Sequence, residues 1–306
     1  MSRHVVVGAG APGRAVALLL AEQGVPVRQI TRSGNGPEHP LIERVAADVR
    51  DAERLIALTA DADVLINCAI PAYDRWAAEV PAFAAALLAA AERGGARYVM
   101  LGNLYGYGHV HGPMTEDLPM APVSVKGRVR AQMWLDALAA HDAGRVRVTE
   151  IRAAAFLGPG AVSTFTLGIA PQVLAGETAT YPGRLDVAHC WADVGDVART
   201  LVAAARSDRS WGHAWHVPAV ANLSAGALAE RYAKVNGAPA PRLERLDRGA
   251  LAELAVGAPV YGEFVEMLYA TEQPHVLDST VTELALGVRP TGLDEVLVAT
   301  ARGLAG

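Results

Sequence analysis

Three glycines near the start of the chain have the spacing of a phosphate-binding loop. Gly8, Gly10 and Gly13 form a GxGxxG motif in the segment VVVGAGAPGRAVA, between a strand-like apolar run and a helical pattern. The first glycine permits a tight turn, the second lets a pyrophosphate approach the backbone, and the third allows close helix–strand packing. The N-terminus of the helix attracts the anion. The motif therefore predicts a dinucleotide site that also includes Ala11 and Pro12.

The residues that end the second predicted strand indicate which dinucleotide is bound. An NAD-selective site usually has an acidic residue there to bind the ribose hydroxyl. This chain has Thr31, Arg32 and Ser33 instead. A guanidinium and a hydroxyl suit a 2′-phosphate, so the predicted cofactor is NADP(H). Asp48, which precedes Val49, can either accept a hydrogen bond from the adenine amino group or act as an ordinary helix cap.

Short β-branched runs alternate with helical patterns through the first half of the chain. Strands are predicted at residues 4–7, 26–31, 45–47, 63–68, 97–101 and 145–151. Helices are predicted at residues 13–22, 51–59, 76–93 and 124–141, the last capped by Ser124. This alternation is typical of an α/β protein, and it predicts a Rossmann-like, doubly wound parallel sheet with helices on its faces.

The pattern changes after Phe156, where glycines and prolines become frequent. Further helices are predicted at 164–174, 193–205, 225–235, 249–254 and 293–304, and a further strand at 214–217. Residues 1–160 are therefore expected to form the NADP-binding Rossmann domain and 161–186 a substrate-side insertion. Residues 187–220 are expected to return to the Rossmann domain, and 221–306 to form a small C-terminal substrate lobe.

Composition excludes several classes of protein. The 306 residues are 52% apolar and carry a net charge of −5 without a Lys/Arg cluster, so nucleic acid is not an expected partner. The longest apolar run is 82–91, where a membrane span needs about 20 residues. Cys68 and Cys190 fit neither a disulfide scaffold nor a zinc site, which suits a reducing cytoplasm. We expect a cytoplasmic monomer or homodimer that acts on a small molecule.

Further motifs follow the glycine loop in order: Asp48, NCAIP from Asn67, NLYGYG from Asn103, TEDLP from Thr115, FLGPG from Phe156 and WADVGDVA from Trp191. Together they resemble the extended, epimerase-like branch of the short-chain dehydrogenase/reductase superfamily over nearly the whole chain. The resemblance implies NAD(P) binding, and it implies cofactor contacts from Cys68, Ala69, Ile70, Lys126, Ala155 and Phe156. It also implies a catalytic Ser and a YxxxK pair, whose Tyr exchanges a proton with the substrate oxygen.

The chain departs from that pattern at the catalytic positions. Asn103 occupies the Ser position, where an amide can still hydrogen-bond a carbonyl oxygen. One alignment places Lys126 at the Tyr position and Arg130 at the Lys position, and the other places Pro122 and Lys126 there. Both lack the Tyr. The chain thus resembles the atypical members of the superfamily, which include polyketide ketoreductases.

Loss of the tyrosine leaves open which group supplies a proton. Lys126 can donate one if burial lowers its pKa, and Tyr105 and Tyr107 are alternatives. A phenol on the substrate can also release its own proton while Asn103 holds the ketone oxygen. We favour this last route at the level of sequence. Asn103, Lys126 and Tyr105 are the catalytic candidates in the chain.

Aromatic residues beyond the predicted strands suit a pocket for a bulky aromatic substrate, although each can equally be core packing. The candidates are Tyr73, Trp76, Tyr107, Phe156, His189 and Trp191. His189 and Cys190 lack a third ligand nearby, so no metal is expected. The resulting hypothesis is an NADPH-dependent ketoreductase. The alternatives are a nucleotide-sugar epimerase that retains NAD and a non-catalytic NADP sensor.

Overall fold

Seven parallel strands form the main sheet in the order β10-β6-β5-β4-β1-β2-β3. The computed structural model describes residues 3–305. The strands are β1 (His4–Val7), β2 (Val27–Thr31), β3 (Ile42–Ala46), β4 (Val64–Asn67), β5 (Arg97–Asn103), β6 (Val148–Ala153) and β10 (Ala214–His216). The order reverses between β1 and β4, which places the switch point beside the glycine loop. The predicted Rossmann-like fold is confirmed.

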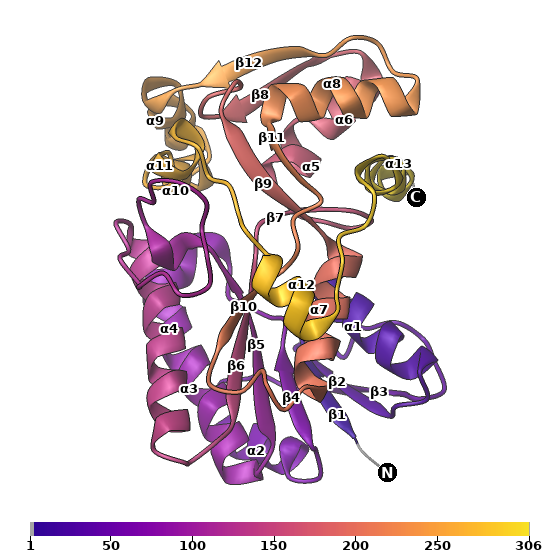
Figure 1. Cartoon of the computed structure of the whole chain (residues 1–306), viewed down its shortest axis with the longest axis vertical. Helices are drawn as coiled ribbons and strands as arrows, with labels where there is room; N and C mark the ends of the chain where they lie inside the picture. The colour runs from indigo at the N-terminus through magenta and orange to yellow at the C-terminus, as the bar shows by residue number, and fades with distance from the viewer. Residues whose placement is uncertain (1–2, 306) are drawn as a thin grey trace.

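Helices cover both faces of this sheet (Figure 1). They are α1 (Ala11–Glu22) and α7 (Val194–Arg206) on one face, and α2 (Ala52–Thr59), α3 (Trp76–Gly94) and α4 (Val125–Asp142) on the other. Side chains alternate between the faces along each strand. Val6 packs in one core with Leu20 and Leu201, whereas Val5 packs in the other with Leu87. The alternation fixes the register of β1 between two apolar layers.

A second lobe lies above the carboxyl ends of the strands (Figure 1). The lobe has two sheets. One contains β7 (Ala155–Leu157), β9 (Ala188–Asp193) and β11 (Ala221–Ser224), and the other contains β8 (Thr178–Pro182) and β12 (Arg242–Leu246). Its helices are α5 (Thr164–Gly168), α6 (Ala170–Ala175), α8 (Ala225–Asn236) and α13 (Leu293–Ala305). Phe165, Trp191 and Tyr232 stack edge to face in its core.

Short segments connect the lobe with the main sheet. They are η1 (Tyr73–Arg75), η2 (Tyr105–Tyr107), α9 (Arg248–Gly257), α10 (Val260–Val265), α11 (Tyr269–Glu272) and α12 (Thr280–Leu286). Figure 1 shows α9, α10 and α11 above the start of α4, and α12 beside α7 and β10. The chain therefore leaves the Rossmann unit and returns to it twice.

The structure differs from the predicted organisation in three respects. Residues 187–220 do not all return to the main sheet, because β9 belongs to the lobe. Residues 221–306 are not all in the lobe, because α12 packs on α7 and β10. The helix predicted at 164–174 is two helices, α5 and α6, with Pro171 in the first turn of the second. Proline lacks an amide hydrogen, so it favours a new helix start over a continuous helix.

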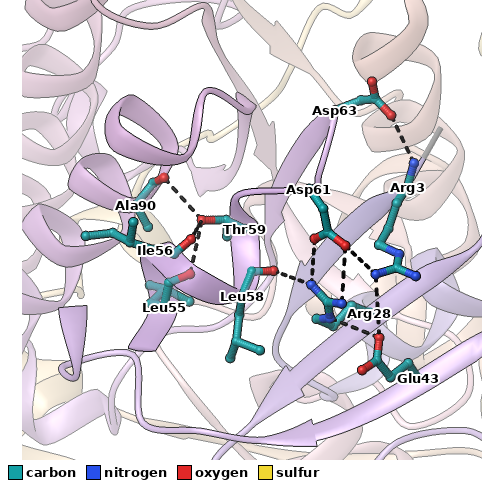
Figure 2. A network of polar contacts seen from close by, with 10 residues as sticks. All are labelled: Arg3, Arg28, Glu43, Leu55, Ile56, Leu58, Thr59, Asp61, Asp63 and Ala90. Atoms are coloured by element: carbon teal, nitrogen blue, oxygen red, sulfur yellow. Dashed lines mark hydrogen bonds and ion pairs between the residues drawn. The ribbon is translucent and has the colours of Figure 1, made fainter. Parts of the chain in front are cut away.

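A network of hydrogen bonds and ion pairs joins the amino ends of β2 and β3 to the turn before β4 (Figure 2). This edge of the sheet is opposite the glycine loop. Arg28 on β2 donates to Asp61 and to the Leu58 carbonyl, both at 2.7 Å, and to Glu43 at 2.9 Å. Arg3 also pairs with Asp61. Charged groups thus connect β2, β3 and the α2–β4 turn at the amino edge of the sheet, opposite the carboxyl edge.

No helix within residues 3–305 is long and apolar enough to cross a membrane. The expectation from the longest apolar run agrees with this finding. That run, residues 82–91, lies inside α3 and contributes Phe83 and Leu87 to a buried core.

We expect His4 to make the fold sensitive to acid. Its ring is 5% exposed and neither nitrogen has a partner in the described chain, and burial lowers its pKa from 6.5 to about 4. The folded state holds His4 neutral, so its contribution to stability is complete above pH 6.5 and is lost as the pH falls toward 4. Lowering the pH to about 5.5 should cost about 1 kcal/mol at this site.

Urea denaturation of the unchanged chain and of His4→Phe, at about pH 7.5 and about pH 5.5, measures this contribution. His4→Phe should show the smaller loss of stability on acidification. His111→Phe, at an exposed position, is the control. Equal losses in the unchanged chain and His4→Phe would show that His4 is not held neutral by the fold.

Candidate active site

The turn after β1 brings α1 unusually close to the sheet. Gly8 has a φ of +97°, and a Cβ on Gly13 would lie 2.2 Å from the Gly8 carbonyl oxygen. Gln29, fully buried on β2, donates from Nε2 to the carbonyls of Gly8 at 2.9 Å and Gly13 at 3.2 Å. Glycine is therefore required at both positions, and an amide from the neighbouring strand fixes the turn.

Gly10 leaves the N-terminus of α1 open. It caps the helix without a side-chain hydrogen bond, and a Cβ on it would have no heavy atom within 4 Å. The first amides of α1 thus lack a side-chain partner and face open space, which is the arrangement that binds a phosphate. The residues present fit the pyrophosphate of a dinucleotide.

The residues expected on the adenosine side lie at the ends of β2 and β3. Arg32 and Ser33 are exposed, whereas the Thr31 hydroxyl donates to the Asn35 carbonyl at 3.1 Å. Asp48 accepts from Arg50 at 2.7 Å, and this contact lowers the pKa of Asp48 to about 2.

Asp51 caps α2, because its side chain accepts a hydrogen bond from the Arg54 amide. Asp48 is therefore not the helix cap. Its ionised carboxylate and the buried Val49 lie at the end of β3, where the adenine role remains a prediction.

A cavity of about 420 Å³ opens between the carboxyl edge of the sheet and the lobe. It contains most of the predicted nicotinamide-side and substrate-side residues: Pro12, Cys68, Ala69, Ile70, Tyr73, Trp76, Asn103, Tyr105, Ala155, Phe156, His189 and Trp191. Gly8, Gly10 and Ala11 are not among the lining residues, whereas Pro12 in the first turn of α1 is. Among the described residues, no Asp or Glu lines the cavity, and Arg130 is its one permanently charged side chain.

Two polar side chains at and just after the end of β5, Asn103 and Tyr105, line the cavity. Asn103 accepts a hydrogen bond from the Tyr105 amide at 3.1 Å through Oδ1, so its amide NH₂ is the group left to donate. The side chains of Tyr105 and Tyr73 are hydrogen-bonded, and burial raises the pKa of Tyr73 well above its usual range. Asn103 and Tyr105 can thus both donate to a carbonyl oxygen.

Arg130 on α4 forms the floor of the cavity beside these groups. Its guanidinium lies 4.7 Å above the Trp76 ring and donates to the Leu101 carbonyl at 3.2 Å, while Nε has no partner in the described chain. Burial lowers the pKa of Arg130 to about 10, and the charge of Glu150 opposes this shift, so the side chain is cationic at neutral pH. This is the position that one alignment matched to the family Lys.

Lys126 does not line the cavity. It is 3% exposed, with Nζ paired to Glu263 and, at 3.0 Å, to Glu266. Its ammonium also lies 4.4 Å above the Tyr73 ring. The expected catalytic role for Lys126 is therefore not supported, because two carboxylates hold its ammonium outside the cavity. It anchors the segment around α10, whose Phe264 and Met267 cover the cavity.

Tyr107 was expected at the substrate, and the structure corrects this. Its side chain is 1% exposed, and it packs in the core. The hydroxyl accepts from Arg152 at 2.6 Å and bonds His216 Nε2 at 2.7 Å, while burial raises the pKa of Tyr107 to about 12. A tyrosine with both hydrogen bonds used inside the core cannot serve as the proton donor of the cavity.

Several lining residues were missed from the sequence. Tyr181 comes from β8, and Phe264, Met267 and His275 come from the segment after α9. No motif marks these positions, because the fold brings them to the cavity from segments far beyond Asn103 in the chain. Trp191 lines the cavity but is mostly a core residue, with its indole N–H bonded to the Leu223 carbonyl.

No group of three or more His, Cys, Asp or Glu suited to a metal ion occurs among the described residues. His189 and Cys190 therefore have no third ligand of this kind within residues 3–305. Burial raises the pKa of the Cys190 thiol to about 12, which leaves it protonated and unreactive at neutral pH.

The NAD dependent epimerase/dehydratase family matches residues 4–217, which include the glycine loop, Asn103, α4 and β10. The chain belongs to this family. The match covers the whole main sheet, and residues 218–306, which contribute much of the lobe, lie outside it.

Solved structures share the fold over the full chain. A dTDP-glucose 4,6-dehydratase of Bacillus anthracis in complex with NAD superposes with a TM-score of 0.82, at 16% identity, covering 100% of this chain and 97% of that one. A UDP-glucuronic acid 4-epimerase of Bacillus cereus in complex with NAD gives 0.81 at 18%, covering 99% and 98%. A UDP-glucose 4-epimerase of Thermotoga maritima with UDP-glucose gives 0.80 at 17%, covering 99% and 98%.

A curated relative matches only part of the chain. The shikimate dehydrogenase (NADP(+)) of Haloarcula marismortui is 39% identical over 78 residues, which are 26% of this chain and 29% of that protein. The chain thus spans under a third of that relative's length. At this coverage the relative's activity does not transfer to the chain.

We expect Gly10 and Gly13 to respond differently to alanine. Gly10 has a φ of −65° and free space, so Gly10→Ala should fold with unchanged stability but weaken NADPH binding at least about tenfold, because a methyl group enters the phosphate approach. Gly13→Ala should lose about 2 kcal/mol or more of folding stability, since its Cβ would clash with Gly8. Urea denaturation and fluorescence titration with NADPH measure both. Equal affinity of Gly10→Ala and the unchanged chain would show that phosphate does not bind here.

Proposed function

We propose that the protein is an NADPH-dependent reductase of a carbonyl group on a neutral, aromatic small molecule. The observation that carries this proposal is the cavity lining, which is aromatic and apolar, contains no carboxylate among the described residues and has one permanent cation. Tyr73, Trp76, Phe156 and Phe264 offer ring surfaces to a flat substrate. A bulky polyketide-type ketone has the matching shape and charge.

The proposed cofactor is NADP(H). NAD is bound in two of the structures compared above, so family membership supports a nicotinamide dinucleotide. The choice of NADP rests on exposed Arg32 and Ser33 at the end of β2. Arg32 makes no hydrogen bond or ion pair within residues 3–305, so its guanidinium is available to a 2′-phosphate.

The chain's own residues would donate the proton and hold the carbonyl oxygen by hydrogen bonding. Bound NADPH supplies a hydride to the carbonyl carbon, and a proton must reach the oxygen to give the alcohol. We assign that proton to the Tyr105 hydroxyl, which lies near the Arg130 charge. Arg130 stabilises the phenolate left behind, and Asn103 donates to the oxygen. Tyr105 would take the role of the family's Tyr from another position, and Arg130 would take the role of the family's Lys at the position where one alignment places that Lys.

An NAD-retaining epimerase or dehydratase of nucleotide sugars is the second candidate. Family membership favours it, and the superposed structures include such enzymes. A nucleoside diphosphate carries two negative charges that need cationic partners. Among the described residues, Arg130 is the one permanent cation of the cavity lining, and it is already engaged with Trp76 and the Leu101 carbonyl, so the cavity suits a neutral substrate better.

The test measures NADPH and NADH affinity and then NADPH oxidation with neutral aromatic ketones such as tetralones. We expect oxidation of NADPH and preference for NADPH, and Arg32→Asp should weaken NADPH binding at least about tenfold while NADH binding changes little. Tightly retained NAD with interconversion of UDP-sugars and no net oxidation would establish the epimerase instead. NADPH binding without any chemistry would favour the sensor.

Substitution of Tyr105 identifies the proton donor. Tyr105→Phe should lower kcat by about a hundredfold or more with NADPH affinity unchanged, because an acid is removed from the reacting oxygen. Lys126→Met, at the position that one alignment matches to the family Tyr and the other to the family Lys, should instead raise KM more than it lowers kcat, because it releases α10 from α4. Retention of most turnover in Tyr105→Phe would point to a phenol on the substrate as the proton source.

A further inference from the structure

His189 presents an unused nitrogen to the lobe side of the cavity. The residue is on β9 and is 6% exposed, yet Nε2 has no hydrogen-bond partner in the described chain. The same side chain lines the cavity. Leaving a buried ring nitrogen without a hydrogen bond costs free energy. A ligand that hydrogen-bonds this nitrogen would remove that cost and would therefore bind more tightly.

The other nitrogen of His189 determines what Nε2 can bind. Burial lowers the pKa of His189 to about 4. A hydrogen bond with the Ala270 backbone acts in the opposite direction and raises the pKa, as a bond from the ring to a carbonyl oxygen does. Nε2 has no partner, so Nδ1 makes this bond and carries the hydrogen. In the neutral ring Nε2 is then a hydrogen-bond acceptor.

The surroundings keep this part of the cavity neutral. His275 lies directly beside His189, because the two residues pair across a parallel bridge, with the Cys190 amide bonded to the His275 carbonyl. Burial, together with His189, lowers the pKa of His275 to about 4. The Tyr181 ring lies 6.5 Å from the His189 ring. Two neutral imidazoles and a phenol offer no charge to an anion or a cation.

We infer that His189 Nε2 accepts a hydrogen bond from a hydroxyl group of the substrate, at the lobe side of the cavity and away from the reacting carbonyl at Asn103. The inference rests on the proposed function and makes its substrate class more specific. It describes an aromatic ketone that carries a second, un-ionised hydroxyl on the ring system remote from the carbonyl. The aromatic walls between Phe156 and Tyr181 would hold the ring, and His189 would select its hydroxyl.

The probes for this site are 6-hydroxy-1-tetralone and 6-methoxy-1-tetralone, which differ in one donor hydrogen. Calorimetric titration in the presence of saturating NADP⁺ gives the two dissociation constants without any turnover. The hydroxyl ketone should bind about tenfold more tightly to the unchanged chain, the ratio expected for one buried hydrogen bond. His189→Phe should reduce the ratio to about one, since a ring without an acceptor replaces the imidazole.

Two further variants separate this effect from damage to the fold. His189→Gln keeps an acceptor oxygen near the position of Nε2 and should retain a preference for the hydroxyl ketone. His111→Phe, at an exposed position, should leave the ratio unchanged. Equal affinities of the unchanged chain for both ketones, failure to bind the hydroxyl ketone, or an unaltered ratio in a folded His189→Phe protein would each overturn the inference.

The outcome is independent of the reductase assay. Hydroxyl-selective binding that depends on His189, without NADPH oxidation, would support the site and contradict the proposed reaction. Oxidation of NADPH by both tetralones with equal KM values would support the reaction and contradict the site.

Discussion

The close approach of α1 to the turn after β1 is the constraint on which the rest of the structure depends. A helix N-terminus can face a pyrophosphate only if the helix begins directly at the sheet edge, and Gly13 meets the Gly8 carbonyl at a distance that excludes any side chain. Gln29 secures the contact from the neighbouring strand. The strand order reverses between β1 and β4 beside this contact, and Pro12 of the same helix start lines the cavity.

Lys126, near the start of α4, has a structural role as a buried ion-pair partner. The start of α4 still reaches the edge of the cavity, but an ammonium group cannot stay buried without carboxylates to neutralise it. Glu263 and Glu266 provide them, and their segment therefore lies across the cavity with Phe264 and Met267 facing inward. The ion pairs of Lys126 thus account both for its place outside the cavity lining and for the place of the α10 segment beside the cavity.

Charged side chains are few around the cavity and common elsewhere in the fold. The amino edge of the sheet carries the ion pairs of Arg28, and the core beneath η2 holds Tyr107, His216 and Arg152 in one hydrogen-bonded chain. The cavity itself keeps neutral histidines, hydroxyls and rings around Arg130. A neutral lining with one cation selects for substrates that develop charge only during reaction, which is the condition under which a fixed charge contributes most to catalysis.

The sequence by itself determined the Rossmann-like sheet, the glycine loop and many of the residues that line the cavity, because strand alternation, helix periodicity and GxGxxG are local patterns with fixed geometric consequences. Only the tertiary structure decided that Tyr107 is a core residue, that Lys126 is an ion-pair anchor and that Arg130 faces the cavity. These outcomes depend on partners such as His216, Glu263 and Trp76, which approach from distant parts of the chain. The direction of a side chain is set by what packs against it, and no local pattern encodes that neighbour.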